Sequence, residues 1–177
     1  MEKRVNIPND VSVEVKGKII TVKGSKGHLE RDFSDPRFDK KISIEKTGDE
    51  IVVSGPDDRK MKAMIGTIIS HIKNMAAGAE HMHTYKMKII YTHFPVTVEA
   101  KDGKVLVRNF LGERGVRVAK IIGKTEVKVS KDDITISSIS KEDAGQTAAN
   151  IEKSCKLSKR DRRIFIDGIF MQGYKKR

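Results

Sequence analysis

The segment Val11-Ser-Val-Glu-Val-Lys16 recurs 85 residues later as Val96-Thr-Val-Glu-Ala-Lys101. After a two-residue adjustment, Ile51-Val-Val-Ser54 meets Ile134-Thr-Ile-Ser137. Four apolar runs that match in order, with the same turn residues between them, indicate an internal duplication. The sequence therefore predicts two similar domains, residues 1–82 and residues 83–177. The pairs that match at the constant offset are Ile20 with Val105, Val22 with Val107, Lys23 with Arg108, Gly27 with Gly112, Ile42 with Val127 and Ile44 with Val129.

Each copy begins with valines that alternate with polar residues, which is the period of a strand with one buried face. Lys16-Gly17-Lys18 and Lys101-Asp-Gly-Lys104 predict tight hairpin turns, because glycine readily adopts the positive φ that such turns need. A second hairpin is predicted in each copy, with turns at residues 47–49 and 131–133. The strands are thus expected to form antiparallel sheets.

An amphipathic helix is predicted after the strands of each copy. Pro56-Asp57-Asp58 is a start signal for the first, and Ser140-Lys-Glu-Asp143 has the spacing of a capping box for the second. A helix on one side of a small antiparallel sheet buries both apolar faces. The predicted fold class is therefore α+β, a tandem duplication of a small domain with an antiparallel β-sheet and one packed α-helix. The apolar helix faces comprise Met61, Ile65, Ile68, Ile69, Ile72 and Met75 in the first copy, and Ala144, Ala148, Ile151 and Cys155 in the second.

Several smaller segments lead to further predictions. Met87-Lys-Ile-Ile-Tyr91 is expected to be an edge or bridging strand. Gly66 and Gly145 lie inside the two helices at a cost of about 1 kcal/mol each relative to Ala, which predicts a close approach of helix to sheet. Gly24-Ser-Lys-Gly27 and Gly112-Glu-Arg-Gly115 match the GxxG pattern of KH domains, but strands precede both, which favours glycine-rich turns.

The charge of the chain indicates a polyanionic partner. Lys and Arg total 36 against 24 Asp and Glu, which gives a net charge of +12. Neutralising phosphates releases counterions, so such an excess favours nucleic acid. Residues 1–88 have a net charge of +4 and residues 89–177 one of +8, of which residues 156–177 contribute +6. The strongest charge is thus at the C-terminal end.

The remaining composition indicates the cellular setting. Cys155 is the only cysteine, so no intramolecular disulfide can form, and a reducing, cytoplasmic location is expected. Residues 1–9 lack the apolar core of a signal peptide, and no stretch approaches the about 18 apolar residues that span a bilayer. We expect no membrane partner.

The C-terminal segment mixes cationic side chains with Phe165, Phe170 and Tyr174. Arginine binds phosphate through two parallel hydrogen bonds, and lysine acts as a mobile point charge. The alternative interpretation is a final strand, Ile164-Phe-Ile166, packed on the sheet and followed by a solvated basic tail. Apolar neighbours favour burial of the aromatic residues over base stacking. The predicted RNA-binding residues are Lys156, Lys159, Arg160, Arg162, Arg163, Lys175, Lys176 and Arg177, followed by Arg114 and Arg117.

The sequence has no pattern that indicates catalysis. His81-Met-His83 could suggest a metal, but no third and fourth ligand follow at recognisable spacing. No nucleophile motif, phosphate-binding loop or paired carboxylates occur. We expect no enzymatic activity, no metal or other cofactor and no small-molecule substrate. RNA modification or cleavage would need acid–base or metal groups, and membrane-surface binding would need a basic amphipathic helix whose apolar face is uncovered.

Three segments together resemble the archaeal and eukaryotic branch of large-subunit ribosomal protein six, counted as nine in eukaryotes. They are Gly78-Ala-Glu-His-Met-His-Thr-Tyr-Lys-Met-Lys-Ile-Ile-Tyr-Thr-His-Phe-Pro95, Val107-Arg-Asn-Phe-Leu-Gly-Glu-Arg114 and Arg162-Arg-Ile-Phe-Ile-Asp-Gly-Ile169. Each motif is short, but their order and spacing are specific, and the resemblance extends over nearly the whole chain. It departs from the bacterial branch at Lys159-Arg-Asp-Arg-Arg163, so bacterial RNA contacts are not transferable residue by residue.

The resemblance implies a structural constituent of the large ribosomal subunit. Ribosomal RNA would be the main partner, bound mostly by the second domain and the C-terminal segment, with neighbouring ribosomal proteins alongside. It also implies a place near the sarcin–ricin loop and the docking site of translational GTPases. The alternative is a free RNA chaperone or adaptor that is not fixed in a particle. The less basic first domain is expected to face a neighbouring protein or a docking factor.

Overall fold

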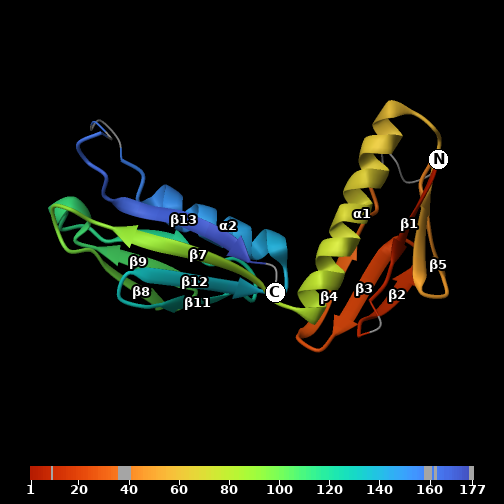
Figure 1. The fold of residues 1–177 in the computed structure, drawn as a ribbon, viewed down its shortest axis with the longest axis horizontal. Helices are drawn as coiled ribbons and strands as arrows, with labels where there is room; N and C mark the ends of the chain where they lie inside the picture. The colour runs from red at the N-terminus through yellow and green to blue at the C-terminus, as the bar shows by residue number, and fades with distance from the viewer. Residues whose placement is uncertain (9, 36–40, 158–160, 162, 176–177) are drawn as a thin grey trace. The chain divides into compact units, whose positions relative to one another are not determined.

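The computed structural model of this 177-residue chain describes residues 1–8, 10–35, 41–157, 161 and 163–175. The chain divides into two compact units, Met1–Met82 and His83–Arg177. Each unit consists of antiparallel strands and one long helix (Figure 1). The α+β class predicted from the sequence is confirmed.

The strands of the first unit form two antiparallel sheets, ordered β1-β6-β5 and β2-β3-β4. The turn at Gly17 has φ +63° and joins β2 to β3 as predicted. A second predicted hairpin joins β5 to β6. The strand bounds are β1 Glu2–Asn6, β2 Ser12–Lys16, β3 Ile19–Gly24, β4 Gly27–Asp32, β5 Ser43–Thr47 and β6 Glu50–Ser54.

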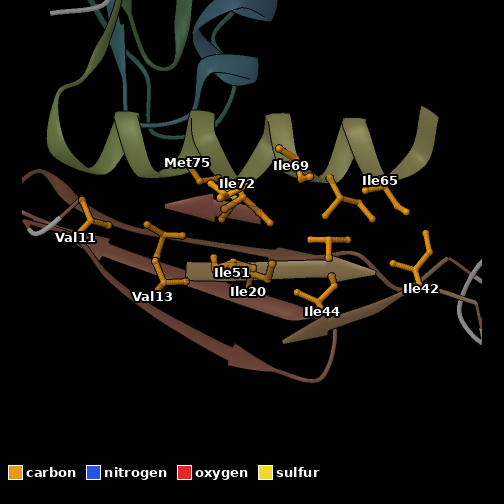
Figure 2. Packing of buried hydrophobic residues seen from close by; sticks show 14 of the residues in the cluster. Val11, Val13, Ile20, Ile42, Ile44, Ile51, Ile65, Ile69, Ile72 and Met75 are labelled. Carbon is orange, nitrogen blue, oxygen red and sulfur yellow. The ribbon is translucent and has the colours of Figure 1, made fainter. Parts of the chain in front are cut away.

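Helix α1, Arg59–Glu80, packs its apolar face against these sheets. Figure 2 shows Ile65, Ile69 and Ile72 pointing from the helix toward the strands, which present Ile20, Ile44 and Ile51 to it. Ile20, Ile51 and Ile65 are 0% exposed, so the helix and both sheets share one core. All six residues of the predicted apolar face of this helix are buried, which confirms the periodicity argument.

The second unit repeats both strand orders. Its sheets are β10-β9-β8 and β11-β12-β7, and the latter gains a fourth strand, β13, on the free side of β7. Helix α2, Lys141–Ser154, has the predicted N-cap, in which Ser140 Oγ accepts a hydrogen bond of 3.2 Å from the Asp143 amide. The other bounds are β7 His83–Ile90, β8 Thr97–Lys101, β9 Lys104–Arg108, the 3-10 turn η1 Phe110–Gly112, β10 Arg117–Lys120, β11 Glu126–Val129, β12 Asp133–Ser138 and β13 Gly168–Lys175.

One strand prediction and one alternative interpretation differ from the structure in position. The segment predicted as an edge or bridging strand lies mostly in β7, an interior strand paired with β12 on one side and β13 on the other. The alternative strand Ile164-Phe-Ile166 does not form, because pairing with β7 begins only at Gly168. Ile164 and Ile166 remain 64% and 51% exposed. Local apolarity indicated a strand, but the neighbouring β7 sets where pairing starts.

The helix glycines differ from each other. A Cβ added at Gly66 would meet nothing within 4 Å, so the predicted close approach of α1 to its sheet is wrong at this residue. A Cβ at Gly145 would lie 3.3 Å from the Tyr85 hydroxyl of β7, so the close approach is confirmed for α2. Gly24 and Gly27 form the β3–β4 turn, where Gly24 lies against Ala79 of α1. The GxxG segment there is thus a structural turn.

Candidate nucleic-acid interface

Three segments meet at one end of the second unit, and we call them together the loop end. They are residues 91–95 after β7, residues 109–116 after β9, and the described residues between 156 and 167, which link α2 to β13 (Figure 1). Ile90, the last residue of β7, pairs with Gly168, the first residue of β13, so the first and third segments lie at the same end of these two strands. Gly112 of the second segment lies against Phe94 of the first.

A buried carboxylate joins two of these segments. The Asp167 side chain is 0% exposed and accepts hydrogen bonds from Thr92 Oγ1 at 2.6 Å and from the His93 amide at 3.4 Å. His93 Nδ1 lies 3.1 Å from the same carboxylate, and its ring stacks on Phe165. Burial alone raises the pKa of Asp167, but these hydrogen bonds together outweigh it and lower the pKa below its usual value.

Arg117 joins the second segment to the third. Its Nε and Nη2 donate to both carboxylate oxygens of Glu113 at 2.8 and 2.6 Å. Its Nη1 donates to the Ser154 carbonyl at 2.9 Å and, at 3.4 Å, to the carbonyl of Lys156. The guanidinium also lies 4.4 Å from the ring centre of Phe110. The charge of Arg117 is therefore used within the protein to fix the loop after β9 to the end of α2.

Three of the remaining predicted cations have exposed side chains. Lys156 and Arg114 are exposed, and the Arg163 side chain is 89% exposed. Arg163 forms an ion pair of 2.8 Å with Asp161, which at such exposure contributes little stability and leaves the cation accessible. The backbone of Lys175 belongs to β13. Lys159, Arg160, Arg162, Lys176 and Arg177 lie outside the described residues.

The aromatic residues of the C-terminal segment have structural contacts. Phe165 stacks on His93 at a centroid distance of 4.8 Å. Tyr174 donates or accepts a 2.6 Å hydrogen bond with His83, and its ring lies 4.8 Å from that of Tyr85. Phe170 is 41% exposed. The expected burial is therefore wrong for Phe170 and Tyr174, which are exposed on β13, and Phe165 is only half-buried.

Sequence reasoning missed Thr92, His93, Phe94 and Asp167 as members of this site. Thr92 and Asp167 are 75 residues apart in the chain, so no local pattern joins them. Thr92, His93 and Phe94 belong to one of the three motifs that indicate the family resemblance, and Asp167 belongs to another. That shared membership was the available signal.

The difference in net charge between the two units is larger than that between the two halves of the sequence. Residues 1–82 have 15 basic and 13 acidic side chains, whereas residues 83–177 have 21 and 11. The second unit thus has a net charge of +10 and the first one of +2. A polyanion would therefore be attracted mainly to the second unit.

The described residues assemble no candidate metal site. No group of three or more His, Cys, Asp or Glu side chains among them is placed to hold a metal. Cys155 is 3% exposed, and burial raises the pKa of its thiol, which disfavours the nucleophilic thiolate. Neither helix of the described chain is both long and apolar enough to cross a bilayer.

Comparison with known proteins gives a consistent result over both units. The family described as "Ribosomal protein L6" matches residues 7–79 and again residues 94–168. The chain is 47% identical over 172 residues to a protein of Methanocella arvoryzae named "Large ribosomal subunit protein uL6", with 96% of this chain and 94% of the relative covered. Equally named relatives from Desulfurococcus amylolyticus and Saccharolobus solfataricus are 47% and 43% identical, covering 95% and 99% of this chain and 91% and 95% of their own lengths. The double match confirms the tandem duplication.

Proposed function

The chain belongs to the Ribosomal protein L6 family, and from this membership we propose that it is a structural constituent of the large ribosomal subunit that binds ribosomal RNA. The observation that supports this most directly is the loop end of the second unit. There Lys156, Arg114 and Arg163 are exposed on segments that internal hydrogen bonds hold together. The unit that presents them has almost all of the net charge.

The proposed mechanism is electrostatic positioning. An A-form RNA helix hides its base edges in a deep, narrow groove, so a protein reads its shape through phosphates and the shallow minor groove. Cations on rigid loops lose less conformational entropy on binding than cations on flexible ones. Arg117 and Asp167 hold the loops, and the exposed cations contact phosphates. This surface is proposed to extend over the other predicted cations, Lys159, Arg160, Arg162, Lys175, Lys176 and Arg177.

We place the protein near the sarcin–ricin loop and the docking region of translational GTPases, as the family resemblance implies. The first unit, with a net charge of only +2, is proposed to face a neighbouring ribosomal protein or a docking factor. A surface that binds another protein needs fewer cations than a surface that binds RNA. No catalytic step is part of this function.

Two measurements test the proposal. The protein should co-sediment with large subunits through high salt, because a fixed constituent makes many simultaneous contacts. A free chaperone or adaptor would be released, and that result would contradict the proposal. Crosslinking within assembled ribosomes, mapped to nucleotide and residue, should join the loop end to RNA near the sarcin–ricin loop. Crosslinks from the first unit should go mainly to protein.

A further inference from the structure

Phe94 is an exposed aromatic side chain in the middle of the loop end. It is 47% exposed, the largest fraction of any aromatic residue among the exposed apolar side chains of the described chain. Its neighbours Tyr91, Thr92, His93 and Pro95 are exposed as well. A phenylalanine of this exposure does not stabilise the core in proportion to its size. Its position therefore needs another explanation.

The ring of Phe94 rests on backbone that is shaped to receive it. A Cβ at Gly112 would lie 3.3 Å from two atoms of the ring and 3.5 Å from a third, so any other residue would crowd it. Gly112 has φ +75°, which also favours glycine. Asn109 Nδ2 donates a 2.9 Å hydrogen bond to the carbonyl of Pro95, which ties the chain beside the ring to the same loop.

This loop contains unusual backbone. Asn109 and Leu111 have φ values of +56° and +53°, and with Gly112 three of four successive residues adopt the left-handed region. A non-glycine residue in that region is strained by on the order of 1 kcal/mol, and such residues gather at ligand-binding sites. Phe110, which is 1% exposed, anchors the loop in the core, so the surface beneath Phe94 is fixed before any ligand binds.

The charge around Phe94 matches a nucleic acid. Arg114 follows Gly112 by two residues and is exposed, and no ion pair to it occurs in the described part of the chain. Glu113, the one acidic residue of this loop, is neutralised by Arg117 through two hydrogen bonds. An exposed cation thus lies two residues along the chain from the glycine that contacts the exposed ring. Proteins bind splayed RNA bases by stacking them on such rings.

We propose that Phe94 is a stacking platform for one unpaired RNA base, with Arg114 contacting an adjacent phosphate. This inference rests on the proposed function and adds a contact that reads RNA structure rather than charge. The surface would select a bulged or loop nucleotide, because a base inside a duplex has no free face. Phosphate contacts alone would not make that distinction.

The test compares Phe94→Leu, Phe94→Tyr and Phe170→Leu in the full-length protein, with in vitro transcribed large-subunit rRNA as the probe over a salt series. Phe170→Leu is the matched control, since Phe170 is 41% exposed on β13. Phe94→Leu should weaken binding about 5-fold to about 150-fold, the range for loss of one base–aromatic stack. The slope of log affinity against log salt should not change, because no charge is removed. Phe94→Tyr and Phe170→Leu should bind like the wild type.

Several outcomes would overturn the inference. Unchanged binding by Phe94→Leu shows that no base stacks there, and the proposed function survives if the wild type binds. A flattened salt slope shows that the loop has lost phosphate contacts instead. Equal losses in Phe170→Leu show a general loss of apolar surface. Ultraviolet crosslinking of the wild type provides a second readout, and a Phe94 peptide joined only to paired nucleotides, or to none, would also contradict it.

Discussion

The two units of this protein share one scaffold and differ in the chain that comes after the helix. In both, two three-stranded antiparallel sheets have the same strand orders, β1-β6-β5 with β2-β3-β4 and β7-β12-β11 with β8-β9-β10. In the second unit the chain continues from α2 through a basic segment and returns as β13 on β7. Among the described residues, no strand pairs with the corresponding side of β1. The segment added after α2 therefore brings much of the second unit's positive charge and takes part in its loop contacts.

The largest expected effect comes from breaking the attachment of β13. Ile169 of β13 is 1% exposed and belongs to the core of the second unit. Ile169→Ala should therefore lower the free energy of unfolding by about 2–5 kcal/mol. All three tyrosines lie in the second unit and there is no tryptophan, so tyrosine fluorescence during urea unfolding follows this unit alone. Met171→Ala is the control, because Met171 is 44% exposed on the same strand. Equal losses for both variants would show that β13 does not belong to the core.

The buried carboxylate should produce the next effect. Asp167→Asn replaces an ionised acceptor of hydrogen bonds from Thr92 and His93, and should lower the unfolding free energy by about 1–3 kcal/mol at pH 7. The folded state lowers the pKa of Asp167, so its contribution is present above the pKa of the unfolded chain. It is lost as the pH falls through the lower pKa of the folded state. Wild type and variant should therefore converge in acid, and a gap that stays constant below pH 4 would contradict this assignment.

Arg114 of the loop after β9 and Arg117, the first residue of β10, should separate stability from RNA binding. Arg117→Ala removes the link between Glu113 and the end of α2, and should cost about 1–2 kcal/mol of stability after allowance for its partial exposure. Arg114→Ala should change stability by less than about 0.5 kcal/mol. It should instead flatten the salt dependence of rRNA binding by about 0.7–0.9. A large stability loss in Arg114→Ala together with a flatter salt slope only in Arg117→Ala would show that the roles of the two arginines are assigned wrongly.

The smallest effect distinguishes the two helices. Gly66→Ala should raise the unfolding free energy of the first unit by about 1 kcal/mol, because α1 has room for the methyl group and alanine favours helix. Gly145→Ala should gain less or lose stability, since its Cβ would press on the Tyr85 hydroxyl at 3.3 Å. Far-ultraviolet circular dichroism follows the first variant and tyrosine fluorescence the second. Equal gains in unfolding free energy for the two variants would mean that α2 can shift away from its sheet without losing stability.

The sequence predicted those parts of the fold that depend on local periodicity. The apolar face of α1, the Ser140 N-cap and the hairpin at Gly17 all follow from residues close together in the chain. The position of β13 does not follow from nearby residues, because its pairing partner β7 lies about eighty residues earlier in the chain. Strand β7 sets the register of β13. The apolar residues of the segment before it suggested a strand where none forms.

The site was predicted only in outline, for the same reason. The excess of cations toward the C-terminus was visible in the sequence, but the function of each cation was not. Arg117 was grouped with Arg114 because both are basic and near glycine, whereas Glu113 and the Ser154 carbonyl give Arg117 a structural contact. Asp167, one of two acidic residues in a basic segment, was not predicted as a site residue, although it holds the loop after β7.

The most direct test of RNA binding by the second unit compares two charge-neutralised proteins over a salt series. One has Lys159, Arg160, Arg162 and Arg163 changed to Gln, and the other has four exposed lysines of the first unit changed: Lys3, Lys16, Lys26 and Lys60. With large-subunit rRNA, the first protein should show a salt slope flatter by about 3, from about 0.7–0.9 per lost phosphate contact. The second should retain the wild-type slope. An unchanged slope in the first protein, or an equal change in both, would contradict the assignment of RNA binding to the second unit.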